Sequence, residues 1–333
     1  MGTPPRDIID VLHRMQLLTG GTPMGEPLAG GVSSDIWQVD LPTGPICVKR
    51  ALPKLRVAAD WQAPVERNLY EARWMRAAGR AVPHCTPTLL GQDEASGTLA
   101  MAYLPAARYP LWKDRLRDGL VDVAFAASVA ASLARIHAAT AADPSLAEDF
   151  PTDAIFHDIR LEPYLTHTGR MHPALADRIR LLIEVTQRNK HALVHGDVSP
   201  KNILCGPEGP VFLDAECAWW GDPAFDLAFC LNHLLLKCLW VPDARRLLLD
   251  SFDAMTAAYL PLVDWETTPA LETRAAHLLP ALLLARVDGK SPVEYITEDG
   301  QRSKVRAVAH RLFADPSDWL ADVALAWKEE ITA

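Results

Sequence analysis

The sequence predicts an α+β fold with two unequal lobes: a small β-rich lobe at the N-terminus and a larger, mostly helical lobe after it. Two observations favour this class. Short segments of strand composition, separated by turn residues, occupy much of residues 28–104. From residue 105 onward, apolar residues mostly recur at helical spacing. We therefore place the N-terminal lobe at residues 1–104 and the C-terminal lobe at 105–333, with a hinge near 102–106.

The N-terminal lobe is expected to begin with a short helix, because residues 6–18 place apolar side chains at helical spacing. Residues 28–41 and 46–50, on either side of the turn Pro42-Thr-Gly-Pro45, are typical of three antiparallel strands. A helix is expected over 61–80, followed by two short strands at 86–91 and 98–104.

The C-terminal lobe is expected to begin with an alanine-rich helix at 121–140, since alanine has the highest helix propensity. The exception to helical structure is 192–214, where a loop leads into two short strands joined by Pro207-Glu-Gly-Pro210. The other helices are expected near 172–190, 223–240, 243–260, 268–287, 300–313 and 315–328.

Composition excludes several classes of partner. The net charge of −9 argues against nucleic acid, which requires a basic face. The longest apolar stretch, 225–241, is interrupted by polar residues and predicts a buried helix, so no membrane partner is expected. The six cysteines show no paired spacing, and the first residues lack a signal-peptide pattern. We expect a cytoplasmic protein; the sequence leaves its oligomeric state open.

The chemistry is concentrated in Leu193-Val-His-Gly-Asp-Val-Ser-Pro-Lys-Asn-Ile-Leu204 and in Leu213-Asp-Ala-Glu216. Asp197 can accept a proton from an attacking hydroxyl, while Asn202 and Asp214 offer hard oxygen ligands for Mg²⁺ bound to ATP phosphates. Phosphoryl transfer needs this combination of a carboxylate and metal ligands at fixed spacing. Glu216 is predicted to reach the metal or a cationic substrate; a plain salt bridge is the alternative.

These motifs resemble those of the aminoglycoside phosphotransferase and choline kinase family, which has the protein-kinase-like fold, over residues 25 to 328. The resemblance implies a bilobal kinase that uses ATP and Mg²⁺ and transfers the γ-phosphate to a small molecule. It also implies that His195 and Asp226 support the loop around Asp197. One departure is Ser199, which stands where protein kinases have a lysine two residues after the base; Lys201 follows at the fourth position.

The resemblance assigns nucleotide contacts to the N-terminal lobe. Lys49, on the third predicted strand, would reach the α- and β-phosphates, with Glu71 as its carboxylate partner and Glu66 as the alternative. Strand alternation places Cys47 and Lys49 on one face. The backbone and hydroxyls of the glycine-containing turn would approach the phosphates, through Gly30, Gly31, Ser33 and Ser34. The hinge would border the adenine, through Met101, Ala102 and Leu104.

The acceptor is expected over Asp197. Trp219 or Trp220 could stack on a sugar or an amine, although packing in the core is slightly favoured. Other candidates come from two segments that carry charged and aromatic residues near expected helix ends: Arg160, Tyr164, Arg286 and Lys290. A pocket bordered by such cations favours an acceptor with an anionic group. The alternative is that they pair with Asp288 and Glu294.

The sequence therefore predicts an ATP-dependent O-phosphotransferase that acts on a hydroxyl of a small metabolite or antibiotic. The alternatives are a 3′-type aminoglycoside kinase, a choline or ethanolamine kinase and, from a different class, an inactive nucleotide-binding pseudokinase. A protein kinase is disfavoured because the Ala-Pro-Glu element is missing. The acceptor and the choice between ATP and GTP stay open.

Overall fold

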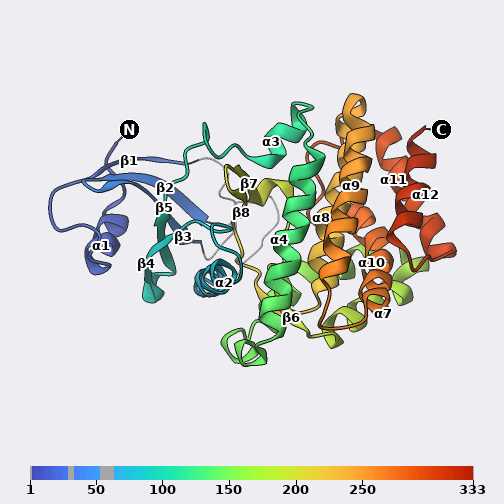
Figure 1. Ribbon diagram of the computed structural model, residues 1–333, viewed down its shortest axis with the longest axis horizontal. Helices are drawn as coiled ribbons and strands as arrows, with labels where there is room; N and C mark the ends of the chain where they lie inside the picture. The colour runs from blue at the N-terminus through green and yellow to red at the C-terminus, as the bar shows by residue number, and fades with distance from the viewer. Residues whose placement is uncertain (1, 29–33, 53–63, 333) are drawn as a thin grey trace.

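The N-terminal lobe is built on an antiparallel sheet with the strand order β1-β2-β3-β5-β4, in a computed structural model that describes residues 2–28, 34–52 and 64–332 (Figure 1). The strands are β1 (Met24–Pro27), β2 (Ser34–Leu41), β3 (Gly44–Ala51), β4 (Leu89–Asp93) and β5 (Thr98–Ala102). The sequence places the first strand too late, since β1 ends before Leu28.

The two helices of this lobe pack near its sheet. Helix α1 (Arg6–Arg14) buries Ile8 and Leu12 in a small apolar cluster with Val39 and Val48 of the sheet. Because side chains alternate along a strand, Cys47 and Lys49 point away from this cluster and line a cavity, as strand alternation predicts. Helix α2 (Arg67–Ala81) carries Glu71 toward the same cavity.

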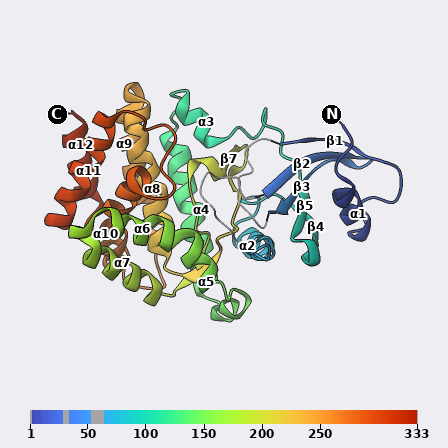
Figure 2. The same cartoon turned by 180° about the vertical axis from the view of Figure 1, so that it is seen from behind.

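The C-terminal lobe is mostly helical and contains two small two-stranded sheets (Figures 1 and 2). Strand β6 (Ala192–Val194) pairs with β9 (Trp219–Gly221), and β7 (Ile203–Gly206) pairs with β8 (Gly209–Phe212). The helices are α3 (Trp112–Arg117), α4 (Val123–Ala141), α5 (Asp153–Phe156), the π-helix η3 (His157–Thr166), α6 (His167–Met171), α7 (Ala176–Arg188), α8 (Pro223–Trp240), α9 (Arg245–Tyr259), α10 (Thr268–Asp288), α11 (Asp299–Ala314) and α12 (Leu320–Thr332).

Short 3₁₀ turns complete the chain: η1 (Glu94–Ser96), η2 (Pro144–Asp149), η4 (Pro173–Leu175), η5 (Pro200–Asn202), η6 (Pro242–Ala244) and η7 (Leu260–Leu262). The passage between the lobes lies between the end of β5 and the start of α3, and the two termini lie far apart along the long axis of the molecule (Figure 1). The expected division after Leu104 falls within this passage, and we propose it as the boundary.

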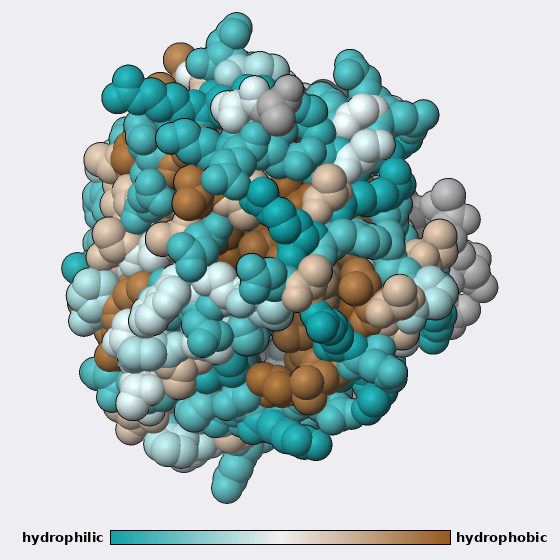
Figure 3. Space-filling model, turned by 90° about the vertical axis from the view of Figure 1, so that its right-hand side faces the viewer, coloured by the Kyte–Doolittle hydropathy of each residue, from teal (hydrophilic) through white to brown (hydrophobic). Residues whose placement is uncertain are grey.

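The core of the C-terminal lobe is centred on α8, whose side chains are buried from Pro223 to Leu239. Asp222 begins this helix by accepting a hydrogen bond from the N–H of Ala224 at 3.0 Å, with Pro223 in the first turn. Helix α4 is, by length and composition alone, apolar enough to cross a membrane, but 50% of that stretch is buried and it packs against α9. The face formed by α11 and α12 mixes hydrophilic and hydrophobic side chains (Figure 3).

Candidate active site

A cavity of about 320 Å³ lies between the lobes. The hinge residues Met101, Ala102 and Leu104 line it, as predicted, together with Lys49, Glu71, Lys201, Asn202 and Asp214. Its apolar lining comes mainly from Leu28, Ile36, Cys47, Met75, Leu111, Leu204 and Phe212. An apolar slot next to a group of charged side chains suits the base and the phosphates of a nucleotide. Gly30, Gly31 and Ser33 lie outside the described residues, and Ser34 begins β2 as a buried residue.

Lys49 stands between two carboxylates. Its ammonium donates to Glu71 Oε2 at 2.6 Å and also to Asp214 Oδ1, so the partner expected from sequence is the one found. Burial opposes the charge on Lys49, but Asp214 and Glu71 outweigh it and raise the pKa of the ammonium. Burial raises the pKa of Glu71, whereas Lys49 and Lys201 overcome burial and lower that of Asp214. Asp214 is the carboxylate of this trio that lies nearer to solvent.

Asn202 and Asp214 are held on adjacent chain segments, because the N–H of Leu213 donates to the carbonyl of Asn202 at 2.8 Å. The Asn202 amide nitrogen donates to the Asp197 carbonyl at 3.0 Å, so its side-chain oxygen is the atom that could hold a metal. Asp214 has a φ of 65°, in the left-handed region that non-glycine residues rarely adopt, as is common at functional sites.

Mg²⁺ fits this donor set. An amide oxygen and a carboxylate are hard ligands, and Mg²⁺ usually completes its shell with phosphate oxygens and water. The described residues contain no group of three or more histidine, cysteine, aspartate or glutamate side chains that could enclose a metal by themselves.

The loop that carries Asp197 is fixed by Asp226 at the start of α8. The N–H groups of His195 and Gly196 donate to its two carboxylate oxygens at 2.7 and 2.8 Å. His195 Nδ1 accepts from the N–H of Asp197 at 3.1 Å, so Nε2 carries the proton and donates to the Leu213 carbonyl at 3.0 Å. Burial lowers the pKa of His195, which keeps the ring neutral. Both residues make the loop contacts that the resemblance implies.

Asp197 is buried and lies between two cations. Its Oδ2 accepts from Arg160 Nη2 at 2.8 Å and from Lys201 Nζ at 3.1 Å. Burial opposes the charge on Asp197, but these cations overcome it and lower its pKa. The other oxygen, Oδ1, is buried and has no hydrogen-bond partner in the described part of the chain. Buried carboxylate oxygens are normally satisfied, so Oδ1 lacks the donor that such an atom usually has.

Glu216 and the two tryptophans make contacts within the protein that the sequence left open as alternatives to ligand binding. Glu216 Oε2 accepts from the fully buried Arg67 at 2.9 Å, which is the salt bridge that the sequence left open. Trp219 does not offer its ring to a ligand: it is buried, stacks on Phe156 at 4.2 Å, and donates to Asp153 at 2.6 Å. Trp220 is half-buried against the main core.

Arg160 and Tyr164 lie on η3, which the sequence did not predict. They are about one π-helical turn apart, and the Arg160 guanidinium lies 5.7 Å from the centre of the Tyr164 ring. The alternative pairing expected for Arg286 and Lys290 is wrong. Lys290 pairs with Glu162 at 2.7 Å near the surface, and Arg286 donates to Tyr164, not to a carboxylate.

Asp288 and Glu294, the partners named in that alternative, are engaged elsewhere: Asp288 by Arg306 at 2.6 Å and by His172 at 2.9 Å, and Glu294 by Lys113. Sequence reasoning also missed that His233 and Lys237 are buried side chains on one face of α8. The signal was their i, i+4 spacing within an apolar helix, which indicates a shared face.

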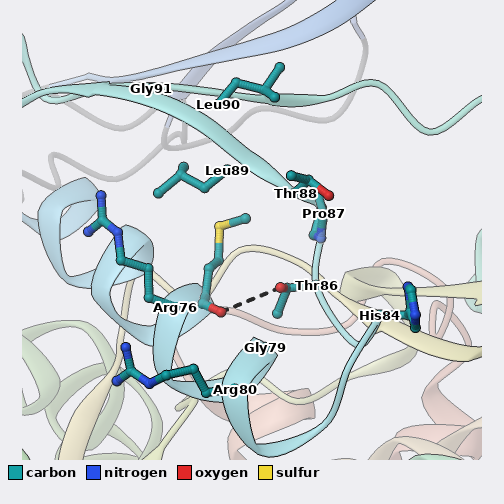
Figure 4. A pocket seen from close by; sticks show the side chains of 11 residues that line it. Arg76, Gly79, Arg80, His84, Thr86, Pro87, Thr88, Leu89, Leu90 and Gly91 are labelled. Atoms are coloured by element: carbon teal, nitrogen blue, oxygen red, sulfur yellow. Dashed lines mark hydrogen bonds between the residues drawn. The ribbon is translucent and has the colours of Figure 1, made fainter.

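A second hollow, of about 520 Å³, lies on the N-terminal lobe between α2 and the segment that leads into β4 (Figure 4). Arg76, Arg80 and His84 border it, and the Thr86 hydroxyl donates to the Met75 carbonyl at 3.4 Å. Met75 lines both hollows and so separates this one from the cavity between the lobes. None of the candidate catalytic side chains lines it.

Comparison with known proteins agrees with this geometry. The family model described as "Phosphotransferase enzyme family" matches residues 25–262. Methylthioribose kinase of Geobacillus thermodenitrificans is 27% identical over 305 residues, which cover 81% of this chain and 75% of that protein. Methylthioribose kinase of Bacillus thuringiensis subsp. konkukian is 24% identical over 238 residues, 63% of this chain and 60% of that protein.

Solved structures show the same fold. Amicoumacin kinase, in complex with AMP-PNP, Ca²⁺ and Ami, superposes with a TM-score of 0.57 at 13% identity, covering 94% of this chain and 95% of that one. Plasmodium vivax ethanolamine kinase superposes with a TM-score of 0.54 at 13% identity, covering 99% of this chain and 88% of that one. A choline/ethanolamine kinase family protein from Mesorhizobium loti superposes with a TM-score of 0.53 at 15% identity, covering 97% of this chain and 99% of that one. The bilobal, kinase-like fold predicted from sequence is confirmed.

Proposed function

The chain belongs to the phosphotransferase enzyme family and is a small-molecule kinase, and from that premise we propose that it transfers the γ-phosphate of ATP to a hydroxyl group. The observation that carries the proposal is the Asp197 carboxylate, whose free Oδ1 lies in the same loop as Asn202. A hydroxyl hydrogen-bonded to Oδ1 would be oriented for in-line attack on the γ-phosphorus.

The transfer is a single displacement. The acceptor oxygen forms a bond to the γ-phosphorus as the bond from that phosphorus to the bridging β–γ oxygen breaks. ADP leaves with that electron pair, and the hydroxyl proton passes to Asp197. Mg²⁺ held by Asn202 and Asp214 would neutralise phosphate charge when bound. Lys49 would contact the α- and β-phosphates, and Lys201, which lines the cavity beside Asp197, would supply the charge that protein kinases place at the position of Ser199.

The adenine is proposed to lie against the hinge. The N–H of Ala102 already donates to the Thr88 carbonyl at 2.8 Å, so we assign the N–H contact with the base to Leu104. Met101 is buried and lines the same cavity, where it would border the base. The reaction is placed in the cytoplasm, because ATP is available there and the cysteines at 47, 85, 205, 217, 230 and 238 are all free thiols.

The test is acceptor-dependent release of ADP from Mg-ATP. The panel contains methylthioribose, aminoglycosides, choline, simple sugars and hydroxy acids, since the similar kinases act on different classes of acceptor. Asp197→Asn is expected to lower kcat by roughly a hundredfold or more, because it removes the proton acceptor. Asp158→Asn, an exposed aspartate on the same lobe, is the matched control. ATP binding without turnover of any acceptor would instead indicate a pseudokinase.

A further inference from the structure

One face of α8 carries side chains that the transfer step does not use. Phe229, His233 and Lys237 follow one another at intervals of four residues, so they lie on one face of the helix. The His233 ring is 5.4 Å from the Phe229 ring. The Lys237 ammonium lies 4.3 Å from the Trp240 ring and 4.6 Å from the Tyr295 ring. Lys237 is 1% exposed, and no carboxylate pairs with it in the described part of the chain.

Arg286 on α10 is a second buried cation without a carboxylate partner among the described residues. Its Nη1 donates to the Ser291 carbonyl, and also to the Tyr164 hydroxyl and to Ser291 Oγ, each of the last two at 3.1 Å. The guanidinium lies 5.4 Å from the Tyr164 ring, which also contacts Arg160. Since Arg160 binds Asp197, a continuous series of contacts leads from the proposed base to Arg286.

Several polar atoms in this region are buried and have no hydrogen-bond partner in the structure as described: Arg286 Nε, His233 Nε2 and the Tyr295 hydroxyl. Unpaired buried cations and unsatisfied buried donors are costly, so native proteins normally compensate them. Of the nearby carboxylates, Glu294 is engaged by Lys113 and Glu162 by Lys290. These two carboxylates are therefore already paired with other cations, and three polar atoms of the region lack a hydrogen-bond partner among the described residues.

We propose that Arg286, His233, Lys237 and Tyr295, here called the basic cluster, bind a carboxylate or phosphate group of the acceptor whose hydroxyl lies against Asp197. An anionic group supplies both the missing negative charge and acceptor oxygens for the unsatisfied donors. The same cluster opposes polycations and quaternary amines, so it disfavours aminoglycosides and choline. This inference rests on the proposed function, since it assigns the acceptor to the kinase site.

The first test measures binding, which does not depend on catalysis. Calorimetric titrations with inorganic phosphate, glycerate and gluconate are carried out in the presence of AMP-PNP and Mg²⁺, with glycerol and glucitol as uncharged counterparts. The anions are expected to bind and the uncharged counterparts are not. Arg286→Gln is expected to weaken anion binding by roughly ten- to a hundredfold, as for loss of one partner of a buried charged pair.

Two further variants keep the result interpretable if Arg286→Gln misfolds. Lys237→Met removes a buried charge while keeping an apolar stem of similar length. This variant is expected to bind the same anions more weakly than wild type does. Arg306→Gln is the matched control, because this arginine pairs with Asp288 outside the cluster, and it is expected to bind anions like wild type. The inference is overturned if wild type binds neither phosphate nor the two carboxylates. It is also overturned if the Arg286 and Lys237 variants bind these anions as tightly as wild type does.

The second test measures turnover with the same matched pairs. Phosphorylation of the carboxylate members alone, with the KM for the acceptor raised in Arg286→Gln and the KM for ATP unchanged, supports the inference. Efficient phosphorylation of uncharged or cationic acceptors with no effect of Arg286→Gln overturns it while leaving the kinase intact. A raised KM for ATP instead of for the acceptor also overturns it, because the cluster would then serve the nucleotide. Anion binding without any turnover would contradict the proposed function alone.

Discussion

Replacing Lys237 with methionine tests whether this buried ammonium lacks a counter-charge. Burial lowers the pKa of Lys237 to about 7. The positive charges of Lys113 and Arg286 also act to lower this pKa, while the negative charges of Glu294 and Asp114 act to raise it. An unfolded lysine titrates near pH 10.4, so between these values the unfolded chain binds more protons and stability rises with pH. From pH 7 to pH 9 the gain is about 2 kcal/mol, equivalent to roughly 3 °C in Tm for a chain of this length.

Methionine cannot titrate, so the variant should lack this gain. Lys237→Met is expected to be more stable than wild type at pH 7, and its advantage should shrink by about 2 kcal/mol by pH 9. The neighbours His233 and Tyr295 should not contribute in this range, because burial lowers the pKa of His233 and raises that of Tyr295.

The assay is thermal unfolding of wild type and variant in parallel at half-unit intervals from pH 6.5 to 9.5, in buffers of equal ionic strength. Lys290→Met serves as the control, since that lysine is half-exposed and pairs with Glu162, and its curve should run parallel to that of wild type. A difference between Lys237→Met and wild type that does not change with pH would refute the reasoning, because Lys237 would then keep one charge state throughout.

Two further predictions concern the nucleotide and the loop. Glu71→Gln removes one of the two carboxylates that hold Lys49, so the KM for ATP should rise by roughly tenfold; initial rates against ATP concentration measure it, and an unchanged KM would contradict the proposed role. Asp226→Asn leaves one acceptor oxygen for the two N–H groups of His195 and Gly196. We therefore expect kcat to fall by roughly tenfold, while the KM for ATP stays within about twofold of the wild-type value. Steady-state kinetics at saturating acceptor decide this, and a wild-type kcat would show that the loop does not need the carboxylate.

Much of the fold could be predicted because local patterns and tertiary packing agree. The alternation around Lys49 identifies its face, and the pair Asp222-Pro223 marks the start of α8. Strand β1 was placed wrongly because Met24–Pro27 is short and contains glycine and proline, which have low strand propensity. The π-helix η3 was missed because its wider spacing matches neither period used to assign elements, and Pro163 lies within it.

The motif spacing was enough to group Asn202 and Asp214, which line one cavity, with Asp197 in the adjoining loop, and the catalytic roles of the three stay a prediction. The site was not predictable where burial decides the role. Trp219 could have stacked on a ligand or on the core, and only the tertiary structure places it on Phe156. Lys237 and His233 interrupt an apolar stretch, and in the sequence they served only to exclude a membrane span. That they are buried without carboxylate partners in the described structure is a property of the packed lobe.

The two cations on Asp197 bear on how the proposed base works. A carboxylate oxygen that accepts hydrogen bonds from Arg160 and Lys201 is a weak proton acceptor, because protonation would disrupt both ion pairs. A loose transition state for phosphoryl transfer requires little deprotonation of the nucleophile before bond formation. Asp197 would therefore act first by orienting the hydroxyl through its free Oδ1 and accept the proton late.

Arg160 links this role to the acceptor, since it contacts both Asp197 and the Tyr164 ring that Arg286 also contacts. An anionic group bound at the basic cluster would share the attraction of Arg160 with Asp197. Such sharing weakens the hold of Arg160 on the carboxylate and makes Asp197 a better proton acceptor only when the acceptor is in place. In an enzyme built this way, ATP hydrolysis without acceptor is slow, because water cannot supply the anionic group.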